Sequence, residues 1–190
     1  MTVYESFIAV NDNSSTTIYQ NNWTAQTFVI GSTGTNEDFY LQGIDLKGRA
    51  YSPGSCYFSI RETDNFLPSG VDLVCGSKAD SELSSSISWI NVDLGSTLLL
   101  KKDTRYAIIM RSPLADSMFS PLQMIIGNGY QGGIAYASIT SGSTWSIRTF
   151  NVDFRVYGLS AGYKVCYDFS NSNNSFALKN LNSSNIILRG

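Results

Sequence analysis

Residues 129–158 read GYQGGIAYASITSGSTWSIRTFNVDFRVYG, and this stretch decides the fold. It opens with a glycine-rich turn and runs through a short β-rich segment to a Ser/Gly turn that carries Trp145. Its last part, residues 152–157, alternates apolar and polar side chains with the period of a half-buried strand. A strand this regular, closed by Gly158 after many similar segments, predicts the last strand of a β-sandwich. The residues expected to close its core are Val152, Phe154 and Val156.

Alternating segments of the same kind precede this stretch at the spacing expected of a sandwich or barrel. In the clearest example, Phe58 and Ile60 face inward and Arg61 faces outward. No helical period is sustained long enough to predict βαβ units. The sequence therefore predicts an all-β chain, folded as a jelly-roll-like two-sheet antiparallel β-sandwich with a short C-terminal β extension. The other expected strands cover residues 4–10, 23–30, 38–47, 71–74, 87–94, 105–111 and 122–126.

Two local features carry further expectations. Gln26 shares a strand face with Phe28, so a buried Gln26 would need hydrogen-bond partners from the backbone. The sequence Leu-Pro-Ser-Gly at residues 67–70 predicts a turn before the strand at 71–74, because Pro presets φ and Gly accepts a positive φ.

The alternating pattern stops at Gly158, and residues 159–162 are expected to act as a hinge. The rest of the chain holds only short apolar pieces, too few to build a core of their own. We therefore predict a sandwich over residues 1–158 and a C-terminal extension over residues 159–190 that serves docking or oligomerisation. The alternative is that the extension adds strands to its own sandwich.

Composition places the chain among globular proteins and argues against several classes of partner. Of its 190 residues, 43% are hydrophobic and only 15% are charged, which suits one β domain with neutral, hydroxyl-rich outer faces. A net charge of −2 with scattered basic residues argues against nucleic-acid binding. No segment approaches the run of about 18 apolar residues that spans a membrane. Because the N-terminus lacks the features of a signal peptide, we expect a protein that stays in the cytoplasm or leaves it by cell lysis.

The residue types that usually carry catalysis or bind metals are few or scattered. The chain has no His, which removes the commonest zinc ligand and general base. The carboxylates, including Asp72 and Asp153, are expected at turns or on outward strand positions. Turn and solvent roles account for them better than paired glycosidase acids or a Ca²⁺-binding loop do. We expect no enzyme activity, no cofactor and no metal.

The three cysteines lie far apart and show no metal-binding spacing. They are best explained as small buried hydrophobic side chains, although one disulfide with one free thiol stays open. They are Cys56, Cys75 and Cys166.

Three aromatic residues are candidates for stacking on a sugar. Trp89 lies on the outward face of its predicted strand, while Tyr130 and Trp145 lie in or beside glycine-rich turns. Exposed aromatic faces beside amide and carboxylate groups form a platform of the kind that sugars bind. The alternative, which the sequence favours, is that these rings cover sheet edges and the bases of loops. If the chain binds a sugar, Trp89, Tyr130 and Trp145 are the candidate ligand-binding residues.

Several short motifs follow one another in a recognisable order. They are AQTF (25–28), IRETD (60–64), LPSGVDL (67–73), the segment 100–108, YQGG (130–133), Trp145 and DFRVYG (153–158). Together they resemble the carbohydrate-binding-module-like jelly rolls found in secreted microbial proteins and in tailed-phage structural proteins. The resemblance covers residues 23–158 and implies a module that is not itself an enzyme. Because the chain shows neither a signal peptide nor an attached catalytic domain, the resemblance favours the phage-particle branch.

From this resemblance we expect a non-enzymatic structural protein of a phage-like virion, such as a capsid decoration protein or a tail-associated subunit, that displays a surface-adhesion module. The alternative is a carbohydrate-binding module, free or carried on a virion. The expected partners are other virion subunits or further copies of the chain, in a homo-oligomer or a larger assembly, together with a glycan. A polysaccharide depolymerase is the least favoured possibility.

Overall fold

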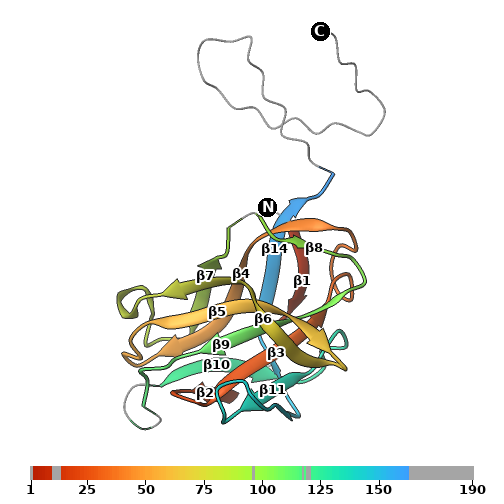
Figure 1. Ribbon diagram of the computed structural model, residues 1–190. Helices are drawn as coiled ribbons and strands as arrows, with labels where there is room; N and C mark the ends of the chain where they lie inside the picture. The colour runs from red at the N-terminus through yellow and green to blue at the C-terminus, as the bar shows by residue number, and fades with distance from the viewer. Residues whose placement is uncertain (1, 10–13, 96, 117, 119–120, 163–190) are drawn as a thin grey trace, which may run out of the picture.

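The computed structural model describes residues 2–9, 14–95, 97–116, 118 and 121–162, and these fold into two antiparallel β-sheets (Figure 1). A short 3₁₀ turn, Asp80–Glu82, is the one helical element of this part of the chain, and no helix there is long and apolar enough to cross a membrane. The predicted all-β sandwich is confirmed.

The larger sheet has eight strands. Its main path is β1 (Thr2–Phe7), β14 (Phe154–Ser160), β4 (Phe39–Ala50), β10 (Leu122–Gly127) and β13 (Asn151–Val152), with β2 (Ser14–Ile18) paired to β10, and β7 (Ser88–Asp93) and β8 (Leu99–Leu100) paired to β4. The smaller sheet has six strands. Their order is β12 (Ser146–Ile147), β11 (Ala135–Ser138), β3 (Trp23–Val29), β9 (Arg105–Arg111), β5 (Cys56–Asp64) and β6 (Leu67–Lys78).

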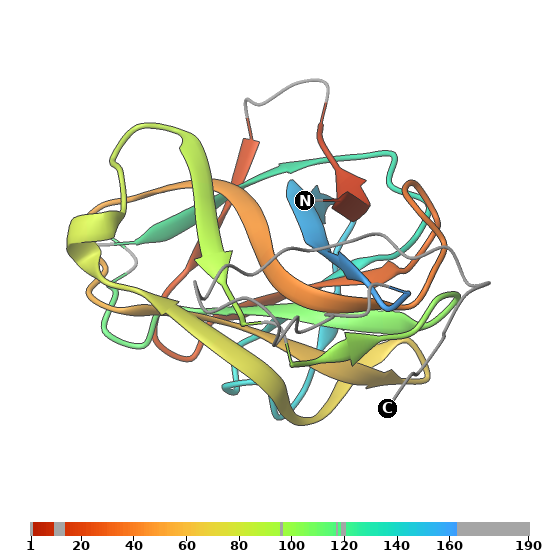
Figure 2. The ribbon, with the colours of Figure 1, turned by 90° about the horizontal axis from the view of Figure 1, so that it is seen from above.

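The two sheets lie face to face as two layers (Figure 2). The chain passes repeatedly between them: β1 and β2 belong to the eight-stranded sheet, β3 to the six-stranded sheet, β4 to the first again, and β5 and β6 to the second. Most neighbours within a sheet are therefore not consecutive in the chain, which is the arrangement of a jelly-roll-like sandwich.

The core between the sheets is built from the inward residues that strand alternation predicts. Phe28, Phe58, Phe154 and Val156 have no exposed surface. Burying a side chain of this kind completely contributes about 1.5–3 kcal/mol to stability. The ring of Phe154 meets that of Tyr130 nearly edge-on, with the centroids 5.3 Å apart, a favoured geometry for aromatic pairs.

Gln26 is buried, and its amide has the backbone hydrogen-bond partners that the sequence led us to expect for a buried glutamine. It is fully buried, and the Val152 N–H donates to Gln26 Oε1 at 2.8 Å. The amide nitrogen donates to the Thr27 carbonyl at 2.9 Å and to Asn151 Oδ1 at 3.2 Å. The side chain therefore joins the two sheets through hydrogen bonds that satisfy its polar atoms.

Residues 67–70 do not form the predicted turn; they begin the long strand β6. The hairpin turn is made instead by Asn65 and Phe66, whose φ angles of 47° and 70° fit a tight turn with the right-handed twist of the strands. Pro68 is tolerated because β6 is an edge strand, where a missing N–H costs no sheet hydrogen bond.

Asp153 is fully buried, and its predicted outward position is wrong. It separates β13 from β14, so the single strand expected over residues 152–157 is split. The Ala9 N–H donates to Asp153 Oδ1 at 2.9 Å, which brings the chain after β1 against this break. A side chain at a break between strands no longer follows the alternation of either strand.

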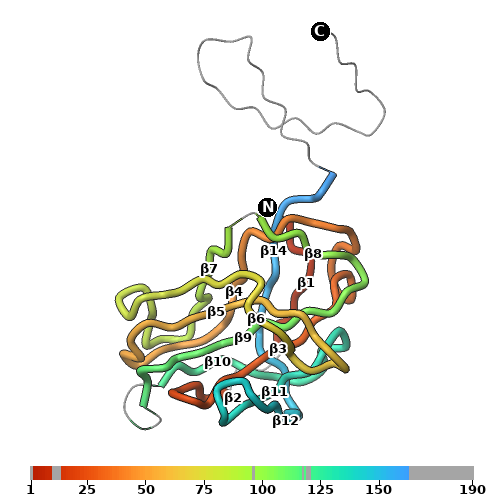
Figure 3. The backbone as a smooth tube through the Cα atoms, viewed as in Figure 1, coloured from red at the N-terminus to blue at the C-terminus, as the bar shows by residue number. Residues whose placement is uncertain are grey.

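The last described strand, β14, continues through Gly158 to Ser160, so the sandwich extends past the predicted boundary. Ser160 pairs with Phe39 of β4, and Gly158 pairs with Thr2 of β1. Strands β1 and β14 therefore lie side by side at one end of the sandwich (Figure 3). Residues 163–190, which make up most of the predicted C-terminal extension and include Cys166, lie outside the described residues.

Candidate functional site

The candidate site lies on the outer face of the six-stranded sheet, where the edge strand β6 carries a large bulge. Ile60 of β5 pairs with Val74 of β6. The next pair along β5 is Glu62 with Ser69, so several residues of β6 lie opposite Arg61 alone. Bulges bend a strand and re-aim its side chains. This bulge forms one wall of the site.

The bulge places Asp72 over two arginines and a serine. Gly70 lies at its start with a φ of 67°, a conformation that glycine adopts at no steric cost. Asp72 Oδ1 accepts hydrogen bonds from Arg61 Nε at 2.7 Å and from Ser59 Oγ at 2.8 Å. Asp72 Oδ2 accepts a hydrogen bond from Arg111 Nη2 at 2.7 Å. Because Arg61 lies on β5 and Arg111 on β9, the carboxylate ties the edge strand to its two nearest neighbours.

Trp23, the first residue of β3, lies over both guanidinium groups. Its ring centroid is 5.2 Å from the guanidinium carbon of Arg111 and 5.9 Å from that of Arg61. The indole N–H donates to the carbonyl of Gln20 at 3.1 Å, which fixes the orientation of the ring. Each cation–π contact contributes about 0.5–1 kcal/mol at an exposed site and more where water is excluded.

Trp23 is supported from behind by a second, smaller hydrophobic cluster on the outer face of the sheet. Gly142 lies between Trp23 and Trp145, where an added Cβ would come within 2.8 Å of the Trp23 ring and 3.5 Å of the Trp145 ring. The absence of a side chain at this position lets both rings pack closely. The buried members of the cluster are Ala25, Ala107, Ile109 and Tyr136, with Trp23, Ile134 and Trp145 packed against them.

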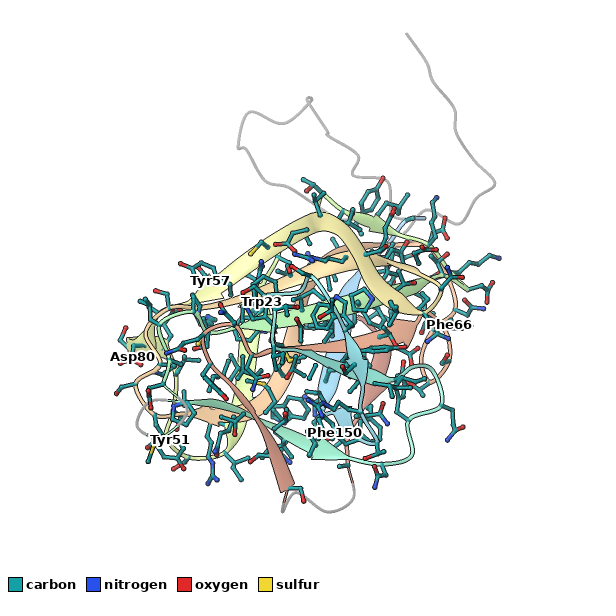
Figure 4. The ribbon with its side chains drawn as sticks, turned by 60° about the horizontal axis from the view of Figure 1, so that its bottom comes forward. Trp23, Tyr51, Tyr57, Phe66, Asp80 and Phe150 are labelled. Carbon is teal, nitrogen blue, oxygen red and sulfur yellow. The ribbon has the colours of Figure 1, made fainter. Side chains whose placement is uncertain are left out.

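A pocket of about 300 Å³ opens beside the Asp72 network. Tyr57, which is 39% exposed, and Trp23 both line it and lie on the same side of the molecule (Figure 4). The lining combines aromatic and apolar groups with one carboxylate and one guanidinium, a composition common in sites for small molecules. The lining residues are Trp23, Tyr57, Asp72, Cys75, Arg111 and Pro113.

The electrostatics of the pocket keep Asp72 ionised. Burial raises the pKa of its carboxyl, but the hydrogen bonds from Arg61, Ser59 and Arg111 outweigh burial and lower that pKa below its usual value. Burial also raises the pKa of the Cys75 thiol, against the opposing effect of Arg111, whose Nη2 lies 3.5 Å from the sulfur. At neutral pH the pocket is therefore lined by a carboxylate, the guanidinium group of Arg111 and a neutral thiol.

This arrangement is suited to binding. Both oxygens of Asp72 already accept strong hydrogen bonds, and its lowered pKa makes the carboxylate a poor proton acceptor and leaves it no proton to donate at neutral pH. Among the residues that the structure describes, no group of three Cys, Asp or Glu side chains is placed to hold a metal ion. What the pocket offers is aromatic surface beside fixed charged groups.

Trp89, the first predicted binding residue, lies on the outer face of the other sheet. Its ring has the guanidinium carbon of Arg155 at 4.0 Å from the centroid and the amine of Lys47 at 5.9 Å. The ring is partly buried and Arg155 covers it closely, so a sugar would compete with this side chain for the ring. The role predicted for Trp89 stays a prediction.

Tyr130 requires a correction to its predicted surface role. It is only 6% exposed, and its hydroxyl donates to Glu5 Oε1 at 2.9 Å. The turn that carries it also brings Gly133 against the carbonyl of Thr27, at a distance no side chain would allow. Burial, followed by the nearby Glu5 carboxylate, raises the pKa of the tyrosine. Tyr130 is a core residue.

Of the three predicted binding residues, only Trp145 lies near the pocket. It packs beside Trp23 on the outer-face cluster. No protein-family model matches the chain, and no curated protein matches it.

Sequence reasoning missed the aromatic residues of the pocket and the two arginines of the Asp72 network. The signal for them was present in strand alternation: Gln26 and Phe28 inward place Trp23 outward, and Phe58 and Ile60 inward place Tyr57 outward. Arg61 and Arg111 follow by the same rule. What alternation does not show is that these outward positions lie beside one another across β3, β9 and β5.

Proposed function

We propose that this chain is a non-enzymatic sugar-binding module whose binding surface is the pocket on the outer face of the six-stranded sheet. The observation that carries the proposal is the pairing of aromatic surface, from Trp23 and Tyr57, with the charged groups of Asp72 and Arg111 around one hollow. The C–H faces of a sugar ring pack on aromatic rings, and its hydroxyl groups bond to charged acceptors and donors.

The rigidity of the pocket supports this proposal. Asp72 is held by three donors, Trp23 by its indole hydrogen bond and its packing on the cluster behind it. Side chains that are already ordered lose little conformational entropy when a ligand binds. The module thus presents its ligand with a preformed surface, in keeping with the resemblance stated from the sequence.

The test is binding to an array of neutral and acidic oligosaccharides by the wild-type protein and two matched variants. Tyr57→Ala removes an exposed ring from the pocket, whereas Tyr51→Ala removes a ring of similar exposure, 37%, outside the pocket lining (Figure 4). We expect the first variant to weaken binding about tenfold and the second to bind like wild type. Absence of binding to every glycan, or equal loss in the two variants, would overturn the proposal.

Cys75 provides an independent readout at the same pocket. Cys75 is an exposed residue that lines the hollow, contrary to the buried position expected from the sequence, whereas Cys56 is buried in the core as expected. A bound sugar should slow alkylation of Cys75, followed by mass spectrometry of its peptide, and leave the rate at Cys56 unchanged. Equal rates at Cys75 with and without a glycan that binds would place the ligand elsewhere.

The structural role in a phage-like virion is a second proposal, and it rests on the sequence resemblance. It is compatible with the first, because a particle can display a sugar-binding module. Since β14 ends at Ser160, the informative truncation removes residues 163–190 and spares the sandwich. Loss of assembly with retained folding would support a docking role for that segment; normal assembly would contradict it.

A further inference from the structure

The charges around the pocket narrow the class of sugar. Arg61 and Arg111 carry two positive charges, and Asp72, the carboxylate between them, carries one negative charge. The Arg61 and Arg111 side chains are 14% and 15% exposed, so their charges are only partly solvated. In such surroundings charges interact more strongly than they do in bulk water. Two arginines and one carboxylate give this network a net charge of +1 beside the hollow.

The hydrogen bonds show the same excess of donors. Asp72 engages Nε of Arg61 and Nη2 of Arg111. In the part of the chain that the structure describes, no protein atom accepts a hydrogen bond from either Nη of Arg61 or from Nη1 of Arg111. Arg111 Nε is buried and also lacks an acceptor. A guanidinium presents its donors in one plane, which suits an anionic group with two or more oxygens.

From this excess of positive charge and of donors we infer that the pocket binds an acidic sugar, one that carries a carboxylate or a sulfate. This inference rests on the proposed sugar-binding function and names its ligand class. The sugar ring would lie against Trp23 and Tyr57, with its anionic group toward the free Nη atoms of Arg61 and Arg111. A charge-assisted hydrogen bond is about twice as strong as a neutral one, so we expect acidic sugars to bind about tenfold more tightly than neutral sugars.

The experiment compares each acidic ligand with a neutral counterpart that differs only at the anionic group. The probes are galacturonic acid oligosaccharides with their methyl esters, and carrageenan oligosaccharides, which are sulfated galactans without carboxylates, with their neutral desulfated forms. Neutral cello- and chito-oligosaccharides complete the array. We expect binding to at least one acidic probe, about tenfold weaker binding to its neutral counterpart, and an affinity for the acidic probe that falls as salt is raised. The two acidic probes distinguish a carboxylate from a sulfate as the recognised group.

A pair of variants locates the charge selectivity. Arg61→Gln removes one guanidinium while Arg111 and Ser59 still hold Asp72. This variant should lose most of the preference for the acidic probe, measured as the ratio of its affinity to that for the matched neutral probe. Arg155→Gln removes an arginine that stacks on Trp89 on the other sheet, and its preference should match that of wild type.

The possible outcomes separate this inference from the proposed function. Equal binding of an acidic probe and its neutral counterpart would overturn the acidic-sugar inference and leave sugar binding intact. Binding restricted to the neutral oligosaccharides would do the same. If no probe bound at all, the proposed function itself would fail. Because the comparison of matched ligands needs no variant, it stands even if Arg61→Gln does not fold.

Discussion

Two tryptophans on opposite outer faces of the sandwich have nearly the same immediate neighbours. Trp23 has Arg111 at 5.2 Å and Arg61 at 5.9 Å from its ring centroid, and Trp89 has Arg155 at 4.0 Å and Lys47 at 5.9 Å. Each ring therefore lies beside two cations. The pocket described above, however, is lined by Trp23 and not by Trp89.

The difference lies in the carboxylate and in the backbone that carries it. Asp72 bonds to both arginines below Trp23 at 2.7 Å, whereas Asp45 approaches Arg155 below Trp89 only to 3.7 Å. Asp72 projects from a bulge, while Asp45 is a regular residue of β4 paired on both sides. At Trp89 a cation covers the ring. At Trp23 the bulge supplies a carboxylate that holds both arginines in place beside the pocket.

The largest expected difference in stability is between alanine variants of the two tryptophans. Trp23→Ala removes the ring packed on the outer-face cluster and both cation–π contacts, and we expect it to lower the free energy of unfolding by about 3 kcal/mol. Trp89→Ala removes a partly buried ring that belongs to neither hydrophobic cluster of the described residues, and about 1 kcal/mol is expected. Urea denaturation at neutral pH measures both. Equal costs would mean that the cluster behind Trp23 gives it no added support.

Removing the carboxylates gives the next largest difference. Asp72→Ala leaves two partly buried arginines without their shared acceptor, and we expect a loss of about 2 kcal/mol, reduced from the value for a fully buried pair because Asp72 is 24% exposed. Asp45→Ala breaks a long ion pair on the surface and should cost less than about 1 kcal/mol. The same denaturation series tests the pair, and a larger loss for Asp45→Ala would reverse the comparison.

Acid unfolding should distinguish the Asp72 network by its pH dependence. The pKa of Asp72 is lower in the folded state than in the unfolded state, so its carboxylate contributes stability above the unfolded value of about 3.9. That contribution is lost as pH falls below this value and through the folded pKa. In Asp72→Asn, stability should therefore fall less steeply between about pH 5 and pH 2. Trp89→Ala should show the same acid dependence as wild type, and a parallel curve for Asp72→Asn would contradict the assignment.

The smallest expected effect concerns the reactivity of Cys75. Burial raises the pKa of its thiol, and Arg111 partly opposes this shift. Arg111→Gln should raise the pKa further and slow alkylation at pH 8, since only the thiolate reacts. Arg155→Gln, on the Trp89 face, should leave the rate unchanged. Faster alkylation in Arg111→Gln would show that exposure, rather than charge, controls this thiol.

The sequence predicted the interior of the molecule better than its surface. Alternation identified Phe58, Ile60, Phe154 and Val156 as core residues because burial repeats with the period of the strand. It failed at Asp153, where two strands are separated and the alternation no longer applies. Alternation predicts burial where a strand is regular and fails where the strand is interrupted.

The candidate site was harder to predict because it depends on irregular geometry and on neighbours distant in the sequence. Tyr130 was expected at the surface, but it is buried and its ring packs on Phe154 in the core. Trp23, Arg61 and Arg111 come from three strands that are not consecutive in the chain, so their proximity follows only from the order of strands in the sheet. A single sequence read one strand at a time does not contain that order.

The bulge in β6 has a consequence for how such a protein can diversify. Its residues oppose Arg61 alone, while the pairs Ile60–Val74 and Glu62–Ser69 on either side hold the register of the hairpin. Insertions, deletions or substitutions within the bulge therefore alter the wall of the pocket without shifting the inward residues of β5 or β6. The residues that stabilise the core are thus separate from the residues that contact a ligand. Changes in a short stretch of β6 can alter ligand selectivity and leave the core unchanged.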